Sequence, residues 1–206
     1  MSAPFSGTPL READLDPDPL RQFAAWFAAA EAAGVHEPEA MTLATATPDG
    51  APSARMVLLR GFGSAGFDFY TNLESRKARE LAANPRAALV LYWYALGRQV
   101  RIEGDVALLP REESERYFRT RPRGSRLGAW ASAQSTVIAG REELDRRLRE
   151  VAGRFEGGDV PLPPWWGGYR VRPHELEFWQ QGPDRLHDRL RYRRAEGGWT
   201  IERLSP

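Results

Sequence analysis

The sequence has no cysteine and only three histidines, and both shortages restrict the chemistry that this protein can perform. Without cysteine there is no disulfide and no catalytic thiolate, which favours a reducing compartment such as the cytoplasm. His36, His174 and His187 stand far apart in the sequence and form no metal-ligand motif. We therefore expect a cytoplasmic protein without a metal site.

Neither sign of charge is in excess, and long apolar runs are missing. Lys plus Arg number 29 and Asp plus Glu number 28, so the net charge is +1. A nearly neutral chain has no general field that attracts nucleic acid, so anion binding must be local. No apolar run approaches the roughly 20 residues of a membrane span, and the N-terminus lacks the pattern of a signal peptide. We expect neither nucleic acid nor a membrane as a partner.

Lysine is almost absent, since Lys77 is the only one and the other 28 of the 29 basic residues are arginine. It follows Ser75 and Arg76 in a segment of strong helix formers that has Asn72 as an expected cap and Asn84-Pro85 as a stop. Free backbone N–H groups, the positive end of the helix dipole and two cations in one place predict a phosphate site. The alternative is a solvated helix face.

With 206 residues and 42% hydrophobic composition, the chain is long enough for one domain with a substantial core. Residues 1–16 are rich in Pro, Gly and acidic side chains, so we expect a mobile N-terminal arm followed by a single domain over residues 17–206. Periodicity and turn signals predict helices over residues 18–34, 74–83, 110–121 and 139–155. They predict strands over residues 41–47, 54–60, 67–71, 87–94, 98–109, 169–172, 176–180, 186–193 and 199–204.

Three details of this pattern are specific. The strand at 41–47 is expected to form a hairpin with 54–60 across Pro48-Asp49-Gly50, and 55–60 is expected to pair in turn with 67–71 across a glycine-containing loop of several residues. The strand at 87–94 is so continuously apolar that both of its faces are expected to be buried. Mostly antiparallel strands with peripheral helices indicate an α+β protein, mainly β, in which the sheet forms a barrel.

Seven motifs, in order and from Asp18 onward, resemble those of the pyridoxine/pyridoxamine 5′-phosphate oxidase family. They are Arg-Met-Val-Leu-Leu at 55, Phe-Tyr-Thr-Asn-Leu-x-Ser-Arg-Lys at 69, Arg-Gln-Val at 98, Arg-Pro-Arg-x-Ser at 121, Ala-Trp-x-Ser-x-Gln-Ser at 129, Val-Pro-Leu-Pro-x-x-Trp-Gly-Gly at 160, and Glu-Phe-Trp-Gln at 177 followed by Arg-Leu-His-Asp-Arg at 185. The resemblance implies an FMN-binding split β-barrel of antiparallel, Greek-key type. It also implies a homodimer with FMN between subunits, and oxidation of pyridoxine or pyridoxamine 5′-phosphate to pyridoxal 5′-phosphate, with O₂ reoxidising the flavin to give H₂O₂.

The resemblance also implies which residues form the site. Its flavin contacts fall on Arg55, Met56, Val57, Leu58, Leu59, Arg60, Tyr70, Thr71, Ser75, Arg76, Lys77, Gln99, Gln134, Ser135, Trp179 and Arg189. Its substrate contacts fall on Arg60, Tyr117, Arg121, Ser125, Arg185, Leu186 and His187. Residues 185, 187 and 189 would alternate along a strand and line one wall. We assign catalysis to Arg185, placed over the reacting carbon, and to His187, hydrogen-bonded to the substrate.

Two positions depart from the family pattern. Arg60 stands where the family usually has lysine, and Ser2-Ala-Pro-Phe5 replaces an N-terminal Arg-x-x-Tyr that closes over the substrate. Two other functions stay open: an FMN oxidase for another ring substrate, as in phenazine-forming relatives, and a non-catalytic carrier of flavin or pyridoxal phosphate. The intact Arg121-Pro-Arg-Gly-Ser125 and Arg185-Leu-His187 motifs favour the pyridoxine/pyridoxamine phosphate oxidase.

Individual residues also have simpler explanations. Gln99 and Gln134 would suit a solvated strand edge, and Trp179 would suit a core. Tyr117 and Arg121 share a helix face and would serve as an ordinary basic helix end. The basic residues at 185–189 would keep an edge strand soluble. The order of the seven motifs favours the functional interpretation over these separate ones.

Overall fold

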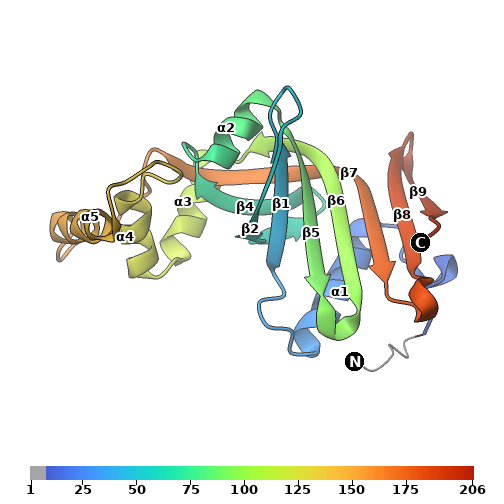
Figure 1. Ribbon diagram of the computed structural model, residues 1–206. Coiled ribbons are helices and arrows are strands. Elements are labelled where there is room, and N and C mark those ends of the chain that lie inside the picture. Colours follow the sequence, from blue (N-terminus) through green and yellow to red (C-terminus); the bar gives the residue numbers. More distant parts are fainter. Residues whose placement is uncertain (1–7) are drawn as a thin grey trace.

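The computed structural model describes residues 8–206, and in this range a nine-stranded antiparallel sheet is surrounded by five α-helices (Figure 1). The helices are α1 (Pro19–Ala32), α2 (Arg76–Ala83), α3 (Arg111–Thr120), α4 (Arg123–Ala131) and α5 (Arg141–Arg154), with short 3-10 turns η1 (Glu12–Asp14), η2 (Tyr94–Leu96) and η3 (Pro183–Arg185). The strands are β1 (Ala40–Ala46), β2 (Pro52–Leu58), β3 (Gly61–Gly63), β4 (Gly66–Asn72), β5 (Arg86–Trp93), β6 (Arg98–Leu108), β7 (Trp166–Gln180), β8 (Asp188–Ala195) and β9 (Gly198–Arg203). None of the helices in the described range is long and apolar enough to cross a membrane.

Strand β7 is the central strand of the sheet, whose strand order is β2-β1-β5-β6-β7-β4-β3. Outside this order, β8 pairs with β7, and β9 pairs with β8. Its first half lies between β6 and β4, and its second half lies between β6 and β8. It therefore runs from the side of α3 and α4 to the side of β8 and β9 (Figure 1). The sequence predicted two strands here because Pro173 interrupts the pattern. The structure instead has a register shift between Glu103 and Gly104, opposite Pro173, and β7 continues through it.

Helix α1 covers the main core, as its sequence predicted. The Asp18 side chain accepts a hydrogen bond from the Leu20 N–H at 2.9 Å, and Pro19 occupies the first turn. Its buried face places Phe23 edge-on to Phe67, with ring centroids 4.9 Å apart. A second, smaller cluster of Phe118, Leu162 and Trp166 joins α3 to the start of β7. That smaller cluster supports the site described below.

Two predicted details are wrong. Strand β2 pairs with β1, as predicted, but it does not also pair with β4, whose hairpin partner is the short β3 across a two-residue loop. Strand β5 is buried on one face only, since Leu91 is fully buried while Tyr92 is 51% exposed. Residues 123–131, for which the sequence predicted no element, form α4, and Gly124 and Gly128 do not interrupt this helix.

Part of the N-terminal segment, for which the sequence predicted a mobile arm unless it folds over the domain, has a defined position. From residue 8 to residue 16 it lies against β7, β8 and β9, where the Leu10 N–H donates to Asp188 at 3.0 Å and the Tyr192 hydroxyl donates to the Asp16 carbonyl at 2.6 Å. Arg203 donates two hydrogen bonds to Glu12, at 2.9 and 3.0 Å. The departure from the family pattern at residues 2–5 lies outside the described residues.

Candidate active site

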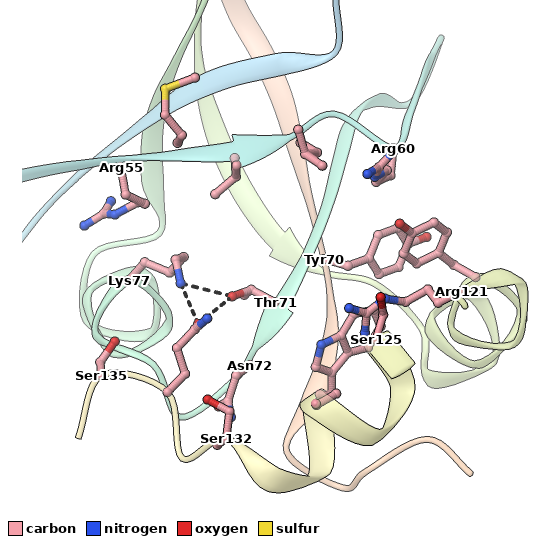
Figure 2. Close-up of a pocket in the computed structure, with 18 of the residues that line it drawn as sticks. Arg55, Arg60, Tyr70, Thr71, Asn72, Lys77, Arg121, Ser125, Ser132 and Ser135 are labelled. Carbon is pink, nitrogen blue, oxygen red and sulfur yellow. Dashed lines mark hydrogen bonds between the residues drawn. The ribbon is translucent and has the colours of Figure 1, made fainter. Parts of the chain in front are cut away.

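A cleft of about 1200 Å³ opens between β2, β4, α2 and α4 (Figure 2). Pockets for single small molecules usually measure about 300–1,000 Å³, so this one has room for a cofactor and a substrate together. Fourteen predicted site residues line it: Arg55, Met56, Val57, Leu58, Arg60, Tyr70, Thr71, Arg76, Lys77, Tyr117, Arg121, Ser125, Gln134 and Ser135. Leu59 and Ser75 do not, because Leu59 is in the core and Ser75 is buried at the start of α2.

Lys77 anchors one end of the cleft. Its ammonium group donates to Gln134 Oε1 at 2.8 Å and to Thr71 Oγ1 at 3.1 Å, and Thr71 donates to the same Gln134 oxygen, as the dashed triangle in Figure 2 shows. Burial and, to a lesser degree, the positive charge of Arg55 together lower the pKa of Lys77 to about 8, against the opposing effect of the Glu80 carboxylate. This end of the cleft therefore holds a desolvated cation, which favours an anion.

Two arginines flank Lys77 and share one carboxylate. Glu80 Oε1 accepts from Arg76 Nε at 2.8 Å, and Glu80 Oε2 accepts from Arg55 Nη2 at 3.3 Å. Burial works against the charged form of Glu80, yet hydrogen bonds from Ser53, Thr45 and Arg76 bring its pKa down to about 2. The predicted cap is corrected here, because Ser75 is the N-cap residue of α2 and Asn72 accepts from the Glu74 N–H before the helix begins.

Arg121 forms the other end of the cleft, where aromatic rings hold it. Its guanidinium lies 4.7 Å from the ring centroid of Trp166, and Trp166 in turn stacks at 5.6 Å on Tyr70. Tyr70 stacks at 4.1 Å on Tyr117. Burial lowers the pKa of Arg121, and the charge of Arg60 lowers it further. Arg121 Nη1 is buried without a hydrogen-bond partner, which is a costly state that an anionic ligand would relieve.

The cleft also contains residues that the sequence analysis missed. They are Ser53, Ala54, Asn72, Thr120, Pro122, Gly128, Ala129, Ser132 and Trp166. Five of them, Asn72, Pro122, Ala129, Ser132 and Trp166, lie inside the motifs quoted above, so taking every residue of each motif would have included them. Trp166 is the informative one, because it is the first residue of β7 and it supports Arg121 and Tyr70 together. Its place in the Trp-Gly-Gly motif was a signal for it.

Six predicted residues lie elsewhere and form a second group, which we call the distal cluster: Gln99, Trp179, Arg185, Leu186, His187 and Arg189. Gln99 pairs with Trp179, and Trp179 pairs with Arg189, so these three side chains form one row across β6, β7 and β8. The His187 ring lies 4.6 Å from the Trp179 ring. No residue of the distal cluster lines the cleft. Trp166 and Trp179 are 13 residues apart in β7, which is about 40 Å along an extended strand.

The predicted alternation of residues 185, 187 and 189 along a strand is wrong. Strand β8 begins only at Asp188, and Arg185 lies in η3 with φ +63°, next to Asp184 at φ +51°. Two consecutive left-handed residues without glycine are strained, and such strain concentrates at functional sites. His187 Nδ1 accepts from the Gly182 N–H at 3.2 Å, so a neutral ring carries its proton on Nε2 and offers it to a ligand.

The donors of the cleft fit FMN. A phosphate needs cations and N–H groups, which Arg55, Arg76, Lys77 and the start of α2 supply. The ring system needs amide and hydroxyl groups beside apolar surface, which Gln134, Ser135 and the β2 residues supply. A curled antiparallel sheet that carries such a cleft defines the class of split-barrel flavin-binding proteins.

Comparisons with known proteins identify the family. The profile described as pyridoxamine 5′-phosphate oxidase matches residues 27–155, and the profile described as the pyridoxine 5′-phosphate oxidase C-terminal dimerisation region matches residues 166–206. The chain is 61% identical over 197 residues to the pyridoxine/pyridoxamine 5′-phosphate oxidase of Rubrobacter xylanophilus, covering 96% of this chain and 91% of that protein. It is 58% identical over 205 residues to the Burkholderia multivorans protein of the same name, covering 98% and 95%. The chain belongs to the pyridoxine/pyridoxamine 5′-phosphate oxidase family.

Solved structures agree on the fold. PhzG from Burkholderia lata, in complex with tetrahydrophenazine-1-carboxylic acid, superposes with a TM-score of 0.92 at 35% identity, covering 99% of this chain and 100% of PhzG. A pyridoxamine 5′-phosphate oxidase-related, FMN-binding protein from Nostoc punctiforme superposes with a TM-score of 0.72 at 19% identity, covering 91% and 98%. The predicted split-barrel fold and the predicted FMN-dependent oxidase of this family are confirmed.

Proposed function

We propose that this chain oxidises pyridoxine or pyridoxamine 5′-phosphate to pyridoxal 5′-phosphate with FMN, through the residues that the sequence predicted. One observation carries the residue assignment: the buried, unpartnered Nη1 of Arg121 lies in the same cleft as the buried cation of Lys77. The cleft thus offers two separate positions for anions, one at each end (Figure 2). A phosphorylated cofactor and a phosphorylated substrate need two such positions.

At the Lys77 end, Arg55, Arg76 and Lys77 bind the flavin phosphate, and Thr71 and Gln134 keep the lysine in place. FMN, when bound, supplies the acceptor for the hydride that leaves the 4′ carbon of the substrate, and O₂ then reoxidises it. The residues need to hold the substrate ring at reacting distance more than they need to act as a strong base.

At the Arg121 end, Arg121, Tyr117 and Ser125 hold the substrate phosphate. The stack of Trp166, Tyr70 and Tyr117 keeps Arg121 oriented and excludes water from one side of it. Arg60 adds a second charge, although an ion pair of 3.4 Å with Glu39 also holds it. Arg185 and His187 position the ring, with His187 donating from Nε2.

The distal cluster completes the site from the second subunit of a homodimer. Within one chain it lies at the far end of β7 from the cleft, so one copy does not assemble all the predicted contacts. The match of residues 166–206 to a dimerisation region supports the dimer, because this region contains Trp179, Arg185, His187 and Arg189. A two-fold axis then gives two identical sites, each with a cleft from one chain and a distal cluster from the other.

The activity is tested by O₂ uptake with pyridoxamine 5′-phosphate on protein that has first been checked for bound flavin. We expect uptake with the phosphorylated amine and little with pyridoxamine itself, because Arg121 would then keep its unpartnered donor. A flavin-loaded protein that consumes no O₂ with the phosphorylated substrates would contradict the proposal and favour the carrier function. Oxidation only of an unrelated ring substrate would favour the phenazine-type alternative.

The composite site is tested by mixing two defective variants. Arg121→Leu damages the cleft and Arg185→Leu damages the distal cluster, so a hybrid dimer keeps one site with neither change. Random exchange of subunits should restore about a quarter of the native sites. The matched control mixes Arg121→Leu with Lys77→Ala, which both change the cleft and leave no native site in the hybrid. Absence of recovery in exchanged Arg121→Leu and Arg185→Leu hybrids would show that each chain uses its own distal cluster.

A further inference from the structure

Glu80 is a carboxylate buried beside a site proposed to bind a phosphate, where a negative charge would ordinarily weaken binding. Its side chain is 5% exposed, and it lies on the face of α2 that points to β1 and β2. Thr45 and Ser53 donate to Glu80 Oε2 at 2.5 and 2.6 Å. Arg55 donates to the same oxygen and Arg76 donates to Oε1, so Glu80 accepts four hydrogen bonds, three of them at Oε2.

These contacts fix the guanidinium of Arg55 in one orientation. Arg55 Nη1 donates to the Leu43 carbonyl at 3.1 Å and to Thr45 at 2.6 Å, and Nη2 donates to Ser53 and to Glu80. Strand β2 alone would leave this long side chain free to turn into solvent, since the strand lies at one end of the sheet order. The carboxylate, the two hydroxyl groups and the Leu43 carbonyl therefore occupy all four terminal N–H groups of Arg55 and leave only its Nε–H available to the cleft.

Arg76 is held differently. It uses only Nε on Glu80, in an i,i+4 ion pair, and its side chain is 60% exposed. Within the described residues, its two terminal amino groups make no hydrogen bond. Because a guanidinium binds phosphate through two N–H groups at once, fixing Nε leaves such a pair ready for an anion.

We propose that Glu80 is a positioning residue for the flavin phosphate: its buried carboxylate holds Arg55 and Arg76 in the orientations that bind the phosphate. This inference rests on the proposed assignment of the phosphate to Arg55, Arg76 and Lys77. The ordering of the two arginines before binding outweighs the repulsion between the carboxylate and the phosphate, because the arginine side chains then lose little conformational freedom on binding.

The variant Glu80→Gln separates the two effects. Glutamine keeps the volume and can still accept from Thr45 and Ser53, but its amide group cannot accept from both arginines and carries no charge. If charge alone mattered, FMN would bind more tightly to this variant. If Glu80 positions the two arginines, FMN binds to Glu80→Gln about tenfold more weakly than to the native protein. This corresponds to the loss of one charge-assisted hydrogen bond.

The measurement is the dissociation constant of FMN and of riboflavin for the apoprotein, by quenching of flavin fluorescence. Riboflavin lacks the phosphate, so its affinity should be equal in the native protein and in Glu80→Gln. A matched control, Glu74→Gln, removes the same charge from an exposed residue just before α2 that makes no side-chain ion pair with Arg55 or Arg76. It should leave FMN affinity unchanged or slightly raised. Ser53→Ala, which removes one donor to Glu80, should weaken FMN binding less than Glu80→Gln.

Several outcomes would overturn the inference. Tighter binding of FMN to Glu80→Gln would show that charge dominates, and an equal loss of FMN and riboflavin affinity would show a purely structural role. If Glu80→Gln does not fold, an unchanged FMN affinity in Ser53→Ala would count against it. Arg76→Ala and Lys77→Ala test the underlying site separately. If they lower FMN affinity selectively and Glu80→Gln does not, only the positioning role fails, whereas if they too leave FMN affinity unchanged, the proposed phosphate site fails.

Discussion

Raising the pH above 8 should lower the affinity of this protein for FMN, because Lys77 then loses its proton. Burial, reinforced by the charge of Arg55, lowers the pKa of Lys77 to about 8, whereas the phosphate dianion needs the charged ammonium. A bound phosphate opposes the loss of that proton, so binding and protonation are linked. Affinity therefore falls with rising pH as soon as the pH exceeds the pKa of Lys77 in the free protein.

The size of the effect follows from that pKa. When one proton is required and the free group titrates near pH 8, the dissociation constant at pH 9 should be about tenfold higher than at pH 7. The loss levels off at the full contribution of the Lys77 contact, about tenfold to a hundredfold, since hydrogen bonds to charged groups contribute roughly 1.5 to 3 kcal/mol.

The assay is titration of apoprotein with FMN between pH 6.5 and 9, followed by fluorescence quenching, with riboflavin as the phosphate-free control. In Lys77→Arg the charge persists at all these pH values, so the slope should disappear even if the affinity is lower overall. A slope that persists in Lys77→Arg, or that riboflavin shares, would refute the assignment of Lys77 to the phosphate.

The free energy of unfolding of the apoprotein should rise with pH, whereas the affinity for FMN falls. The pKa of Lys77 is lower in the folded state than its ordinary value of 10.5. Between about pH 8 and 10.5 the unfolded chain therefore binds the proton that the folded protein has released, and the free energy of unfolding from this group rises with pH. Thermal unfolding of Lys77→Met, which lacks the titrating group, would lack this contribution.

Three further predictions concern other parts of the molecule. Arg121→Leu should raise the KM for pyridoxamine 5′-phosphate by about tenfold or more and leave FMN affinity unchanged, and equal effects on both would contradict two separate anion positions. Gly66→Ala should lower the free energy of unfolding by about 1–3 kcal/mol because φ is +131° and a Cβ would meet the Val171 carbonyl, whereas Gly63→Ala meets nothing and should be nearly neutral in thermal unfolding. Arg185→Leu should keep FMN and the dimer but slow anaerobic flavin reduction in stopped flow, and native reduction rates would remove Arg185 from the site.

Short motifs in the sequence were sufficient to predict the features that depend on neighbouring residues, such as the start of a helix. The Asp18-Pro19 cap defined the start of α1, and the single lysine pointed to the start of α2, which the structure places at one end of the cleft. The Arg121 motif pointed to the other end of the cleft, although its role depended on the family resemblance. The unpartnered Nη1 of Arg121 depends on the tertiary structure, since it arises from burial against Trp166.

Other features depend on contacts between distant segments and had no local signal. Pro173 suggested the end of a strand, but the opposite strand accommodates it with a register shift at Gly104. Arg185 and His187 alternate in the sequence like strand residues, yet the chain turns through left-handed conformations at 184 and 185 before β8 begins. The separation of the distal cluster from the cleft follows from the length of β7, which no window of a few residues reports.

The length of β7 has a consequence for how the protein would keep its cofactor. If each FMN is bound by the cleft of one chain and the distal cluster of the other, the cofactor contacts both subunits. The affinity of the protein for FMN is then coupled to the association of the subunits. Free FMN then favours the dimer by mass action, and the dimer favours FMN to the same degree. Dilution would release cofactor and separate subunits in one concerted process, so flavin content would depend on protein concentration as well as on the supply of FMN.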